Sequence, residues 1–198
     1  KWDNDMRILI NRYVNAGDSK VLAEFEDKGL LEILIQNEGI SEEENGALGG
    51  NEAVAEAIEN NIRRIIVDNN PLNPKFYENL SQILDELIEQ RKKGALDYEK
   101  YLKEVINLAK QLQTKNINNI YPPEINSDGK RAIYDNFSQD INWIARLDET
   151  IKTYKSDGYI GNKMKERELK RAIKPLSDEK NLDIDELFEL IKLQEGYQ

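Results

Sequence analysis

Two residue types are missing from this 198-residue sequence, which contains no cysteine and no histidine. The missing cysteine excludes disulfides and thiol nucleophiles, and the two absences together exclude zinc sites built from thiolate or imidazole ligands. The missing histidine also removes the usual general base, so Ser-His-Asp and Cys-His arrangements are impossible. Chemistry based on carboxylates alone stays open.

Long hydrophobic runs are missing as well. The longest, such as residues 8–10 and 29–31, cover only a few positions, whereas a transmembrane helix needs about 20 apolar residues. No charged segment followed by an apolar one has the pattern of a secretory leader. We therefore expect a cytoplasmic protein with no membrane partner, which is compatible with the absence of cysteine. Because the sequence begins within a helical pattern, we also expect it to be part of a longer protein.

The sequence is rich in charge, and this charge is unevenly distributed. Charged residues make up 33% of the chain, hydrophobic residues make up 39%, and the net charge is −10. Residues 18–59 hold twelve acidic and two basic residues, which accounts for the whole negative excess. Residues 163–174 hold six basic and two acidic residues. Such a chain is not a general polyanion binder, but it allows a local contact with nucleic acid.

The spacing of apolar residues predicts helices along most of the chain and strands nowhere, because these residues recur at intervals of three and four. We therefore predict an all-α fold, an irregular helical bundle with antiparallel helical hairpins. The predicted helices cover residues 5–15, 19–37, 51–70, 74–93, 98–112, 130–137, 139–154, 163–176 and 184–191.

Capping residues support several of these boundaries. Asn73 precedes Pro74 at the start of one helix, and Asp97 precedes the next. The short connection through Gly94 predicts an antiparallel helical hairpin at 74–114. Further caps are expected at Ser41, Ser138 and Asp183.

The Tyr121-Pro122-Pro123 sequence is a stiff, extended break between helices and the best boundary within the chain. We predict an N-terminal helical part at 1–120 and a C-terminal helical part at 121–198, the latter with a basic helix at 163–175. The two parts form either one compact domain or two packed subdomains.

Carboxylate chemistry has two weak candidates. Metal-dependent nucleases often use an acidic residue upstream of Glu-x-Lys, and the chain has Glu26-Asp27-Lys28 after Asp18 and Glu168-Leu169-Lys170 after Asp157. Both triplets lie in helical patterns, where side chains two positions apart do not converge. In a sequence that is 33% charged, solvated helix surface is the better explanation. We therefore predict no catalytic residue and no metal site.

A glycine-containing loop from Asp157 to Asn162 precedes the basic helix, and its amides are candidates for binding an anion. The residues concerned are Gly158, Gly161 and Asn162. The loop lacks the Lys-Ser/Thr pair of a P-loop, and no predicted strand precedes it. The alternative is a plain helix–helix connection whose glycines permit positive φ.

The basic helix itself is the main functional candidate. At about 100° per residue, its cations fall on one face and its apolar residues on the other. The cationic face consists of Lys163, Arg167, Lys170, Arg171 and Lys174. Such a face can contact DNA phosphates. The alternatives are an acidic protein partner and an ordinary solvated surface.

Other charged and aromatic residues have simpler explanations. Cations at Arg91-Lys92-Lys93 favour the dipole at the end of a predicted helix. Four aromatic residues are candidates for stacking on bases, although packing in or beside the core is the simpler interpretation of each; they are Tyr121, Tyr134, Trp143 and Tyr159.

Several of these segments, taken in order, resemble a known family. They are Asn73-Pro-Lys-Phe-Tyr-Glu78, Gly94-Ala-Leu-Asp-Tyr98, Tyr121-Pro122, Arg131-Ala-Ile-Tyr-Asp-Asn136, Asp157-Gly-Tyr-Ile-Gly-Asn162 and Lys165-Glu-Arg-Glu-Leu-Lys-Arg-Ala-Ile173. Their order and spacing resemble the C-terminal helical region of the motor (R) subunit of type I restriction enzymes, most clearly from residue 63 to residue 197. Tyr159 departs from the family pattern, which more often has tryptophan there, but an aromatic side chain is kept.

The resemblance implies a parent protein that translocates and cleaves DNA with ATP and Mg²⁺, through domains that precede this chain. For the chain itself it implies a non-catalytic module without a cofactor, which docks the motor onto the methyltransferase and specificity subunits and contacts duplex DNA. A purely structural helical adaptor, which binds a protein partner and no DNA, is the alternative.

Overall fold

The computed structural model describes residue 35 and residues 49–113 and 121–198. These residues form seven α-helices and two short 3-10 helices, and no strand is present among them. The predicted all-α fold is therefore confirmed. The helices expected at 5–15 and 19–37 and the cap expected at Ser41 lie outside the described residues, apart from position 35, which is helical. Within the described ranges, no helix has the length and apolar character needed to cross a membrane.

The chain divides into two compact units. Of the described residues, the first unit contains 49–65 and 80–113, and the second contains 66–79 and 121–198. The main segment of the second unit thus starts close to the double proline. The corner at 66–79, which our prediction placed in the N-terminal part, belongs to the second unit.

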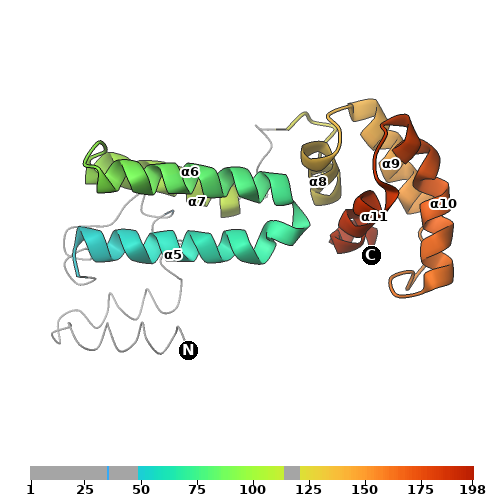
Figure 1. The fold of residues 1–198 in the computed structure, drawn as a ribbon, viewed down its shortest axis with the longest axis horizontal. Coiled ribbons are helices and arrows are strands. Elements are labelled where there is room, and N and C mark those ends of the chain that lie inside the picture. Colours follow the sequence, from blue (N-terminus) through green and yellow to red (C-terminus); the bar gives the residue numbers. More distant parts are fainter. Residues whose placement is uncertain (1–34, 36–48, 114–120) are drawn as a thin grey trace. The chain divides into compact units, whose positions relative to one another are not determined.

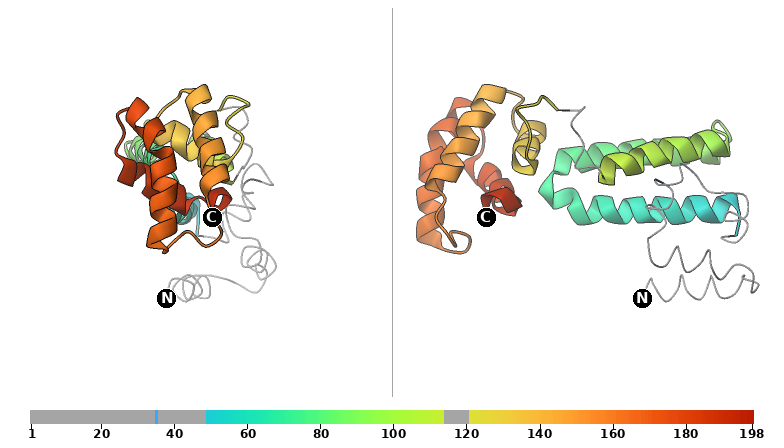
Figure 2. Two further views of the ribbon diagram at one scale, coloured as in Figure 1. Left: turned by 90° about the vertical axis from the view of Figure 1, so that its right-hand side faces the viewer. Right: turned by 180° about the vertical axis from the view of Figure 1, so that it is seen from behind.

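The first unit is built from most of α5 (Asn51–Asn69), from α6 (Pro74–Lys92) beyond residue 79, and from α7 (Tyr98–Gln113). Figures 1 and 2 show α5 running alongside α6, and α6 returning through a tight connection into α7. Gly94 in that connection has φ +68°, a value that glycine adopts without strain. Asp97 caps α7 by accepting a hydrogen bond from the Lys100 amide at 2.9 Å. The predicted hairpin and its cap are therefore present.

A buried ion pair lies in the core of the first unit. The carboxylate of Glu59 is 7% exposed, and it accepts hydrogen bonds from Arg91 Nη2 at 3.0 Å and from the Tyr101 hydroxyl at 2.7 Å. Arg91 also pairs with Glu52 and lies over the ring of Tyr101. Desolvation, followed by the bond to Glu59, raises the pKa of Tyr101. Arg91, which we explained by the helix dipole alone, is thus part of the internal packing.

The second unit packs four helices around an aromatic core. These are α8 (Asp128–Asn136), α9 (Ile141–Tyr154), α10 (Lys163–Glu179) and α11 (Ile184–Leu193), and the 3-10 turns η1 (Asn70–Leu72) and η3 (Glu195–Tyr197) complete the unit. Trp143 is fully buried, and its indole Nε1 donates to the Leu176 carbonyl at 2.9 Å. This bond satisfies a carbonyl of the last turn of α10, which has no partner within the helix.

Two boundaries of the second unit differ from the predicted ones. Asp140, not Ser138, caps α9 by accepting from the Trp143 amide at 3.0 Å. Ser138 Oγ instead accepts from the Asp140 amide, so the serine supports the cap from outside the helix. Helix α8 starts earlier than expected, with Ser127 as its cap. Asp183 caps α11 as predicted.

The C-terminal turn is fastened to the other helices of the second unit. The Tyr197 hydroxyl donates to Asp148 Oδ1 at 2.8 Å, and Asp148 is 7% exposed. The ring of Tyr197 lies against Gly129 so closely that a Cβ atom there would stand 2.6 Å from Tyr197 Cε2. Only glycine therefore leaves room for this ring at position 129.

A polar cluster ties the corner before α6 to α8, within the second unit. Asp135 accepts hydrogen bonds from Asn73 Nδ2 at 2.6 Å and from the Tyr121 hydroxyl at 2.5 Å. Asn73 Oδ1 also accepts a long bond of 3.4 Å from the Phe76 amide, so its expected capping role is present but weak. The burial of Asp135 raises the pKa of its carboxyl group.

Candidate nucleic-acid interface

Helix α10 carries the predicted cationic face. Its inward side buries Leu169, Ile173 and Leu176 against the core of the second unit. Because the apolar side is fixed by packing, the five candidate cations lie on the remaining arc, within about 100° of one another around the helix axis. They are Lys163, Arg167, Lys170, Arg171 and Lys174. Figures 1 and 2 show α10 on the outside of this unit beside α9.

Two of the five cations are held by neighbouring groups. Lys170 Nζ lies 2.5 Å from Asp185 Oδ1 and 4.7 Å from the centre of the Phe188 ring, so α11 contributes both of its contacts. Lys174 Nζ pairs with Asp178 Oδ1 at 2.9 Å, one turn along the same helix. Any anion that binds these two lysines has to compete with a carboxylate.

The other three cations, Lys163, Arg167 and Arg171, are exposed. Within the described ranges, none of their side chains makes an ion pair or a hydrogen bond. They are four residues apart, so they form one row with a spacing of about 6 Å along the helix axis. We refer to these three residues as the free row. Met164, which is 74% exposed, lies beside it.

The amides of Gly161 and of the first turn of α10 form hydrogen bonds within the protein. The Asn162 side chain accepts hydrogen bonds from the amides of Met164 and Lys165, at 3.1 and 3.3 Å. Glu166 Oε1 accepts from the Gly161 amide at 3.0 Å, and Gly161 has φ +81°. Each of these three donors therefore already has an acceptor within the protein. Gly158 has φ +64°, as the connection interpretation requires.

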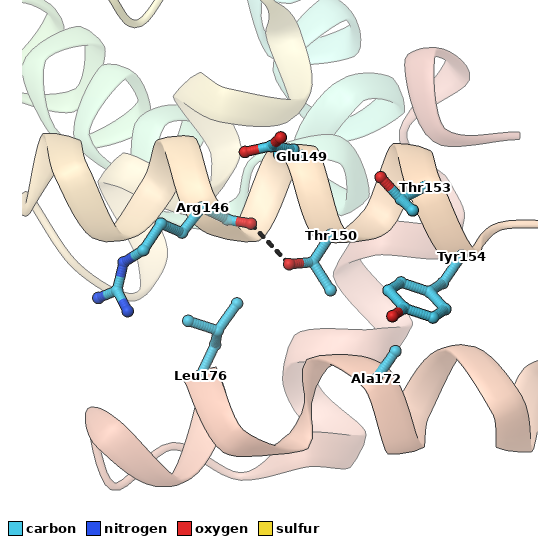
Figure 3. A pocket seen from close by; sticks show the side chains of 7 residues that line it. All are labelled: Arg146, Glu149, Thr150, Thr153, Tyr154, Ala172 and Leu176. Atoms are coloured by element: carbon cyan, nitrogen blue, oxygen red, sulfur yellow. Dashed lines mark hydrogen bonds between the residues drawn. The ribbon is translucent and has the colours of Figure 1, made fainter.

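A shallow groove lies between α9 and α10, with a volume of about 330 Å³. Figure 3 shows the side chains of Thr150 and Tyr154 on α9 facing Ala172 and Leu176 on α10. The lining residues are Arg146, Glu149, Thr150, Thr153, Tyr154, Ala172 and Leu176. Arg146 donates to both oxygens of Glu179, at 2.7 and 2.9 Å. This ion pair raises the pKa of Arg146 and lowers that of Glu179.

The four aromatic candidates pack in or beside the core of the second unit, as the simpler interpretation expected; Tyr134 is partly buried against it. Tyr121, Trp143 and Tyr159 are at most 7% exposed, so packing explains them. Tyr159 meets the ring of Phe188 edge-on, and burial raises the pKa of its hydroxyl group. Tyr154, which was not among the candidates, is 60% exposed. Its position at the last residue of α9 was the available signal, because side chains at a helix end often lie outside the buried face.

The carboxylate candidates do not come together into a site. Lys170 faces Asp185 and Phe188, while Glu168 lies on the exposed side of α10. No group of three acidic residues suited to a metal ion is found in the described ranges. The other triplet, at 26–28, lies outside them.

No protein-family model matches the sequence, and neither a curated protein nor a solved structure was found to match it.

Proposed function

We propose that this chain is a non-catalytic helical module that contacts duplex DNA through the outward face of α10. The observation that carries the proposal is the free row, three exposed cations without an internal partner among the described residues. Elsewhere on the same helix, cations close to a carboxylate are paired with it. A row left unpaired in a chain of net charge −10 is available to an external polyanion.

The geometry favours contacts with the DNA backbone over base recognition. The free row turns by only about 80° around the helix over its three residues, so all three cations face one side of α10 and can approach the same stretch of backbone. Such contacts are electrostatic and independent of sequence. This role agrees with the resemblance, in which another subunit of a type I restriction enzyme recognises the DNA sequence.

Assembly with the methyltransferase and specificity subunits is the second part of the proposal, and it rests on the resemblance alone. In that setting the parent protein supplies ATP- and Mg²⁺-dependent translocation and cleavage, and this chain positions the motor. The module then places its cations against DNA already held by the complex, where even a weak contact is effective.

The DNA contact is tested by neutralising the free row with Lys163→Gln, Arg167→Gln and Arg171→Gln together. Fluorescence anisotropy with a labelled duplex, over a range of salt concentrations, gives the affinity and its salt dependence. We expect weaker binding and a slope of log K against log salt that is shallower by about three, because about one counterion is released per phosphate contact.

The matched control neutralises three exposed cations of the first unit, with Arg64→Gln, Lys92→Gln and Lys103→Gln, and changes the net charge equally. An equal loss in both triple variants would show that net charge alone matters, and it would overturn the assignment to α10. An unchanged salt slope in the α10 variant would overturn it as well.

The assembly role is tested by size-exclusion chromatography with light scattering on the chain mixed with a methyltransferase core, with and without duplex DNA. Co-elution without DNA supports docking. Co-elution only with DNA assigns the association to the DNA contact. If no complex forms in either case, the assembly role is contradicted and the alternative, a purely structural helical adaptor, is favoured.

A further inference from the structure

Tyr154 is an exposed aromatic residue on a structured part of the second unit. Its side chain is 60% exposed at the end of α9, and its ring lies over the groove opposite Ala172 (Figure 3). An exposed ring of this kind loses little conformational entropy on binding and offers a flat face for stacking.

The groove below Tyr154 has the size and chemistry for one flat heterocycle. Its volume of about 330 Å³ lies at the lower end of the range for small-ligand sites. Ala172 and Leu176 supply apolar surface, and the Thr153 hydroxyl group has no partner among the described residues. The cation among the lining residues, Arg146, is already engaged by Glu179, and the carboxylate of Glu149 points away from α10 (Figure 3). The groove therefore offers apolar surface and no unpaired lining cation, which suits a nucleobase better than an anion.

The groove adjoins the free row. Ala172, which forms one wall, directly follows Arg171, the last cation of that row. A strand whose phosphates follow the free row thus has a groove for a base at the end of its path. A row of cations beside an exposed aromatic ring is the arrangement by which proteins bind single strands, because the charges hold the backbone and the ring stacks on a base.

We propose that the groove between α9 and α10 binds one unpaired base of a DNA strand, stacked on Tyr154, while Arg171 and Arg167 hold the adjoining phosphates. This inference rests on the proposed DNA contact of α10. It adds a preference for single-stranded over duplex DNA, because a paired base cannot enter the groove without leaving its stack.

The test uses the full 198-residue chain and three fluorescein-labelled probes: a single-stranded 12-mer of deoxycytidine, an abasic 12-mer with the same backbone, and a 12-base-pair duplex. Anisotropy titrations at one salt concentration give the three affinities. We expect the deoxycytidine strand to bind more tightly than the abasic one, because the abasic strand offers phosphates but no base.

Tyr154→Leu keeps apolar bulk and removes the ring, and Tyr154→Phe keeps the ring. We expect Tyr154→Leu to weaken binding of the deoxycytidine strand by about 5- to 150-fold, the range found for base stacking on aromatic side chains, and to leave the abasic strand and the duplex unchanged. Tyr154→Phe retains wild-type affinity. Ala172→Leu fills the groove with Tyr154 intact and should reproduce the loss, which makes the result independent of any effect on the end of α9.

The outcomes separate this inference from the proposed function. Equal affinity of the deoxycytidine and abasic strands, or no effect of Tyr154→Leu, overturns the base site and leaves the backbone contact standing. Loss of all three probes in Arg167→Gln/Arg171→Gln, with a selective loss in Tyr154→Leu, supports both. Binding of none of the probes by the wild-type chain overturns both.

Discussion

Each unit buries a carboxylate that accepts a hydrogen bond from a tyrosine hydroxyl, but the cation that pairs with this carboxylate differs in burial between the two units. In the first unit, Glu59 accepts a tyrosine hydroxyl from Tyr101 and pairs with Arg91, whose side chain is only 9% exposed. In the second, Asp148 accepts a hydrogen bond from the Tyr197 hydroxyl and pairs at 2.8 Å with Lys152, whose side chain is 54% exposed, while the less exposed Lys130 lies farther away, at 3.7 Å. The nearest cation is therefore buried in one case and solvated in the other.

This difference shows how a charge run should be interpreted. Arg91 belongs to one basic run and forms ion pairs with internal carboxylates. Arg167 and Arg171 belong to another basic run and form no ion pair among the described residues. A run of cations therefore indicates an external partner only after the internal carboxylates within reach have been assigned. Contact with an internal carboxylate, and not exposure alone, separates the two cases, because Lys174 is exposed and is still paired with Asp178.

The largest expected effect is on Arg91. Arg91→Ala leaves the carboxylate of Glu59 buried without its cation, and removing one partner of a buried pair costs about 3–5 kcal/mol of unfolding free energy. Lys152→Ala removes a solvated partner of Asp148 and costs less than about 1 kcal/mol. Urea denaturation followed by circular dichroism measures both. Similar costs for the two variants would show that the two centres are equivalent.

A second prediction concerns the tyrosine of the second centre. Gly129→Ala places a methyl group against the ring of Tyr197, which displaces the ring and its bond to Asp148, and we expect a loss of about 1–3 kcal/mol from such overpacking. Tyr197→Phe, which keeps the ring and loses only the bond, should cost about 1 kcal/mol. A Gly129→Ala variant as stable as the wild type in urea would mean that η3 moves aside freely.

Two neighbours on α10 give a smaller but sharper contrast. Lys170→Gln loses the pair with Asp185 and the contact with Phe188, so we expect a loss of stability of about 0.5–1 kcal/mol. Arg171→Gln loses no internal contact among the described residues and should leave the thermal midpoint unchanged. Duplex affinity should respond in the reverse order, with Arg171→Gln the weaker binder. The same order in both measurements would contradict the distinction between paired and free cations.

The smallest expected effects concern pH and have opposite signs. Burial raises the pKa of Asp135 above its ordinary value of 3.8, so the folded state binds the proton more tightly, and stability falls as the pH rises from 3.8 through the raised pKa. The hydrogen bond from Lys180 lowers the pKa of Asp140, so its contribution is present above 3.8 and is lost as the pH falls through the lowered pKa. In urea denaturation, Asp135→Asn should therefore remove the decrease in midpoint that the wild type shows as the pH rises above 3.8. Asp140→Asn should remove the decrease that the wild type shows as the pH falls below 3.8.

The sequence predicted what depends on neighbours along the chain. The caps at Asp97 and Asp183 and the turn at Gly94 were found because short-range hydrogen bonds and positive φ leave local signatures. The cap of α9 was wrong because Ser138 and Asp140 are both good caps, and only the path of the chain decides between them. Helix α10 continues beyond the predicted end with Pro175 inside it, which removes only the bond to the Arg171 carbonyl.

In the candidate site, too, local features could be predicted from the sequence and contacts between helices could not. The cationic face of α10 follows from periodicity, and the pair of Lys174 with Asp178 follows from the four-residue spacing of a helix. The pair of Lys170 with Asp185 joins two helices, so no local pattern contains it. The groove under Tyr154 depends on how α9 lies against α10, and it could not be predicted for that reason.

The exposure of Met164 has a practical consequence. It is 74% exposed within the first turn of α10, between Lys163 and Lys165, and the chain contains no cysteine. A thiol introduced there as Met164→Cys is unique in the molecule and reacts with a maleimide dye without any background substitution. Energy transfer from that dye to a labelled oligonucleotide would then measure directly how close a bound strand comes to α10.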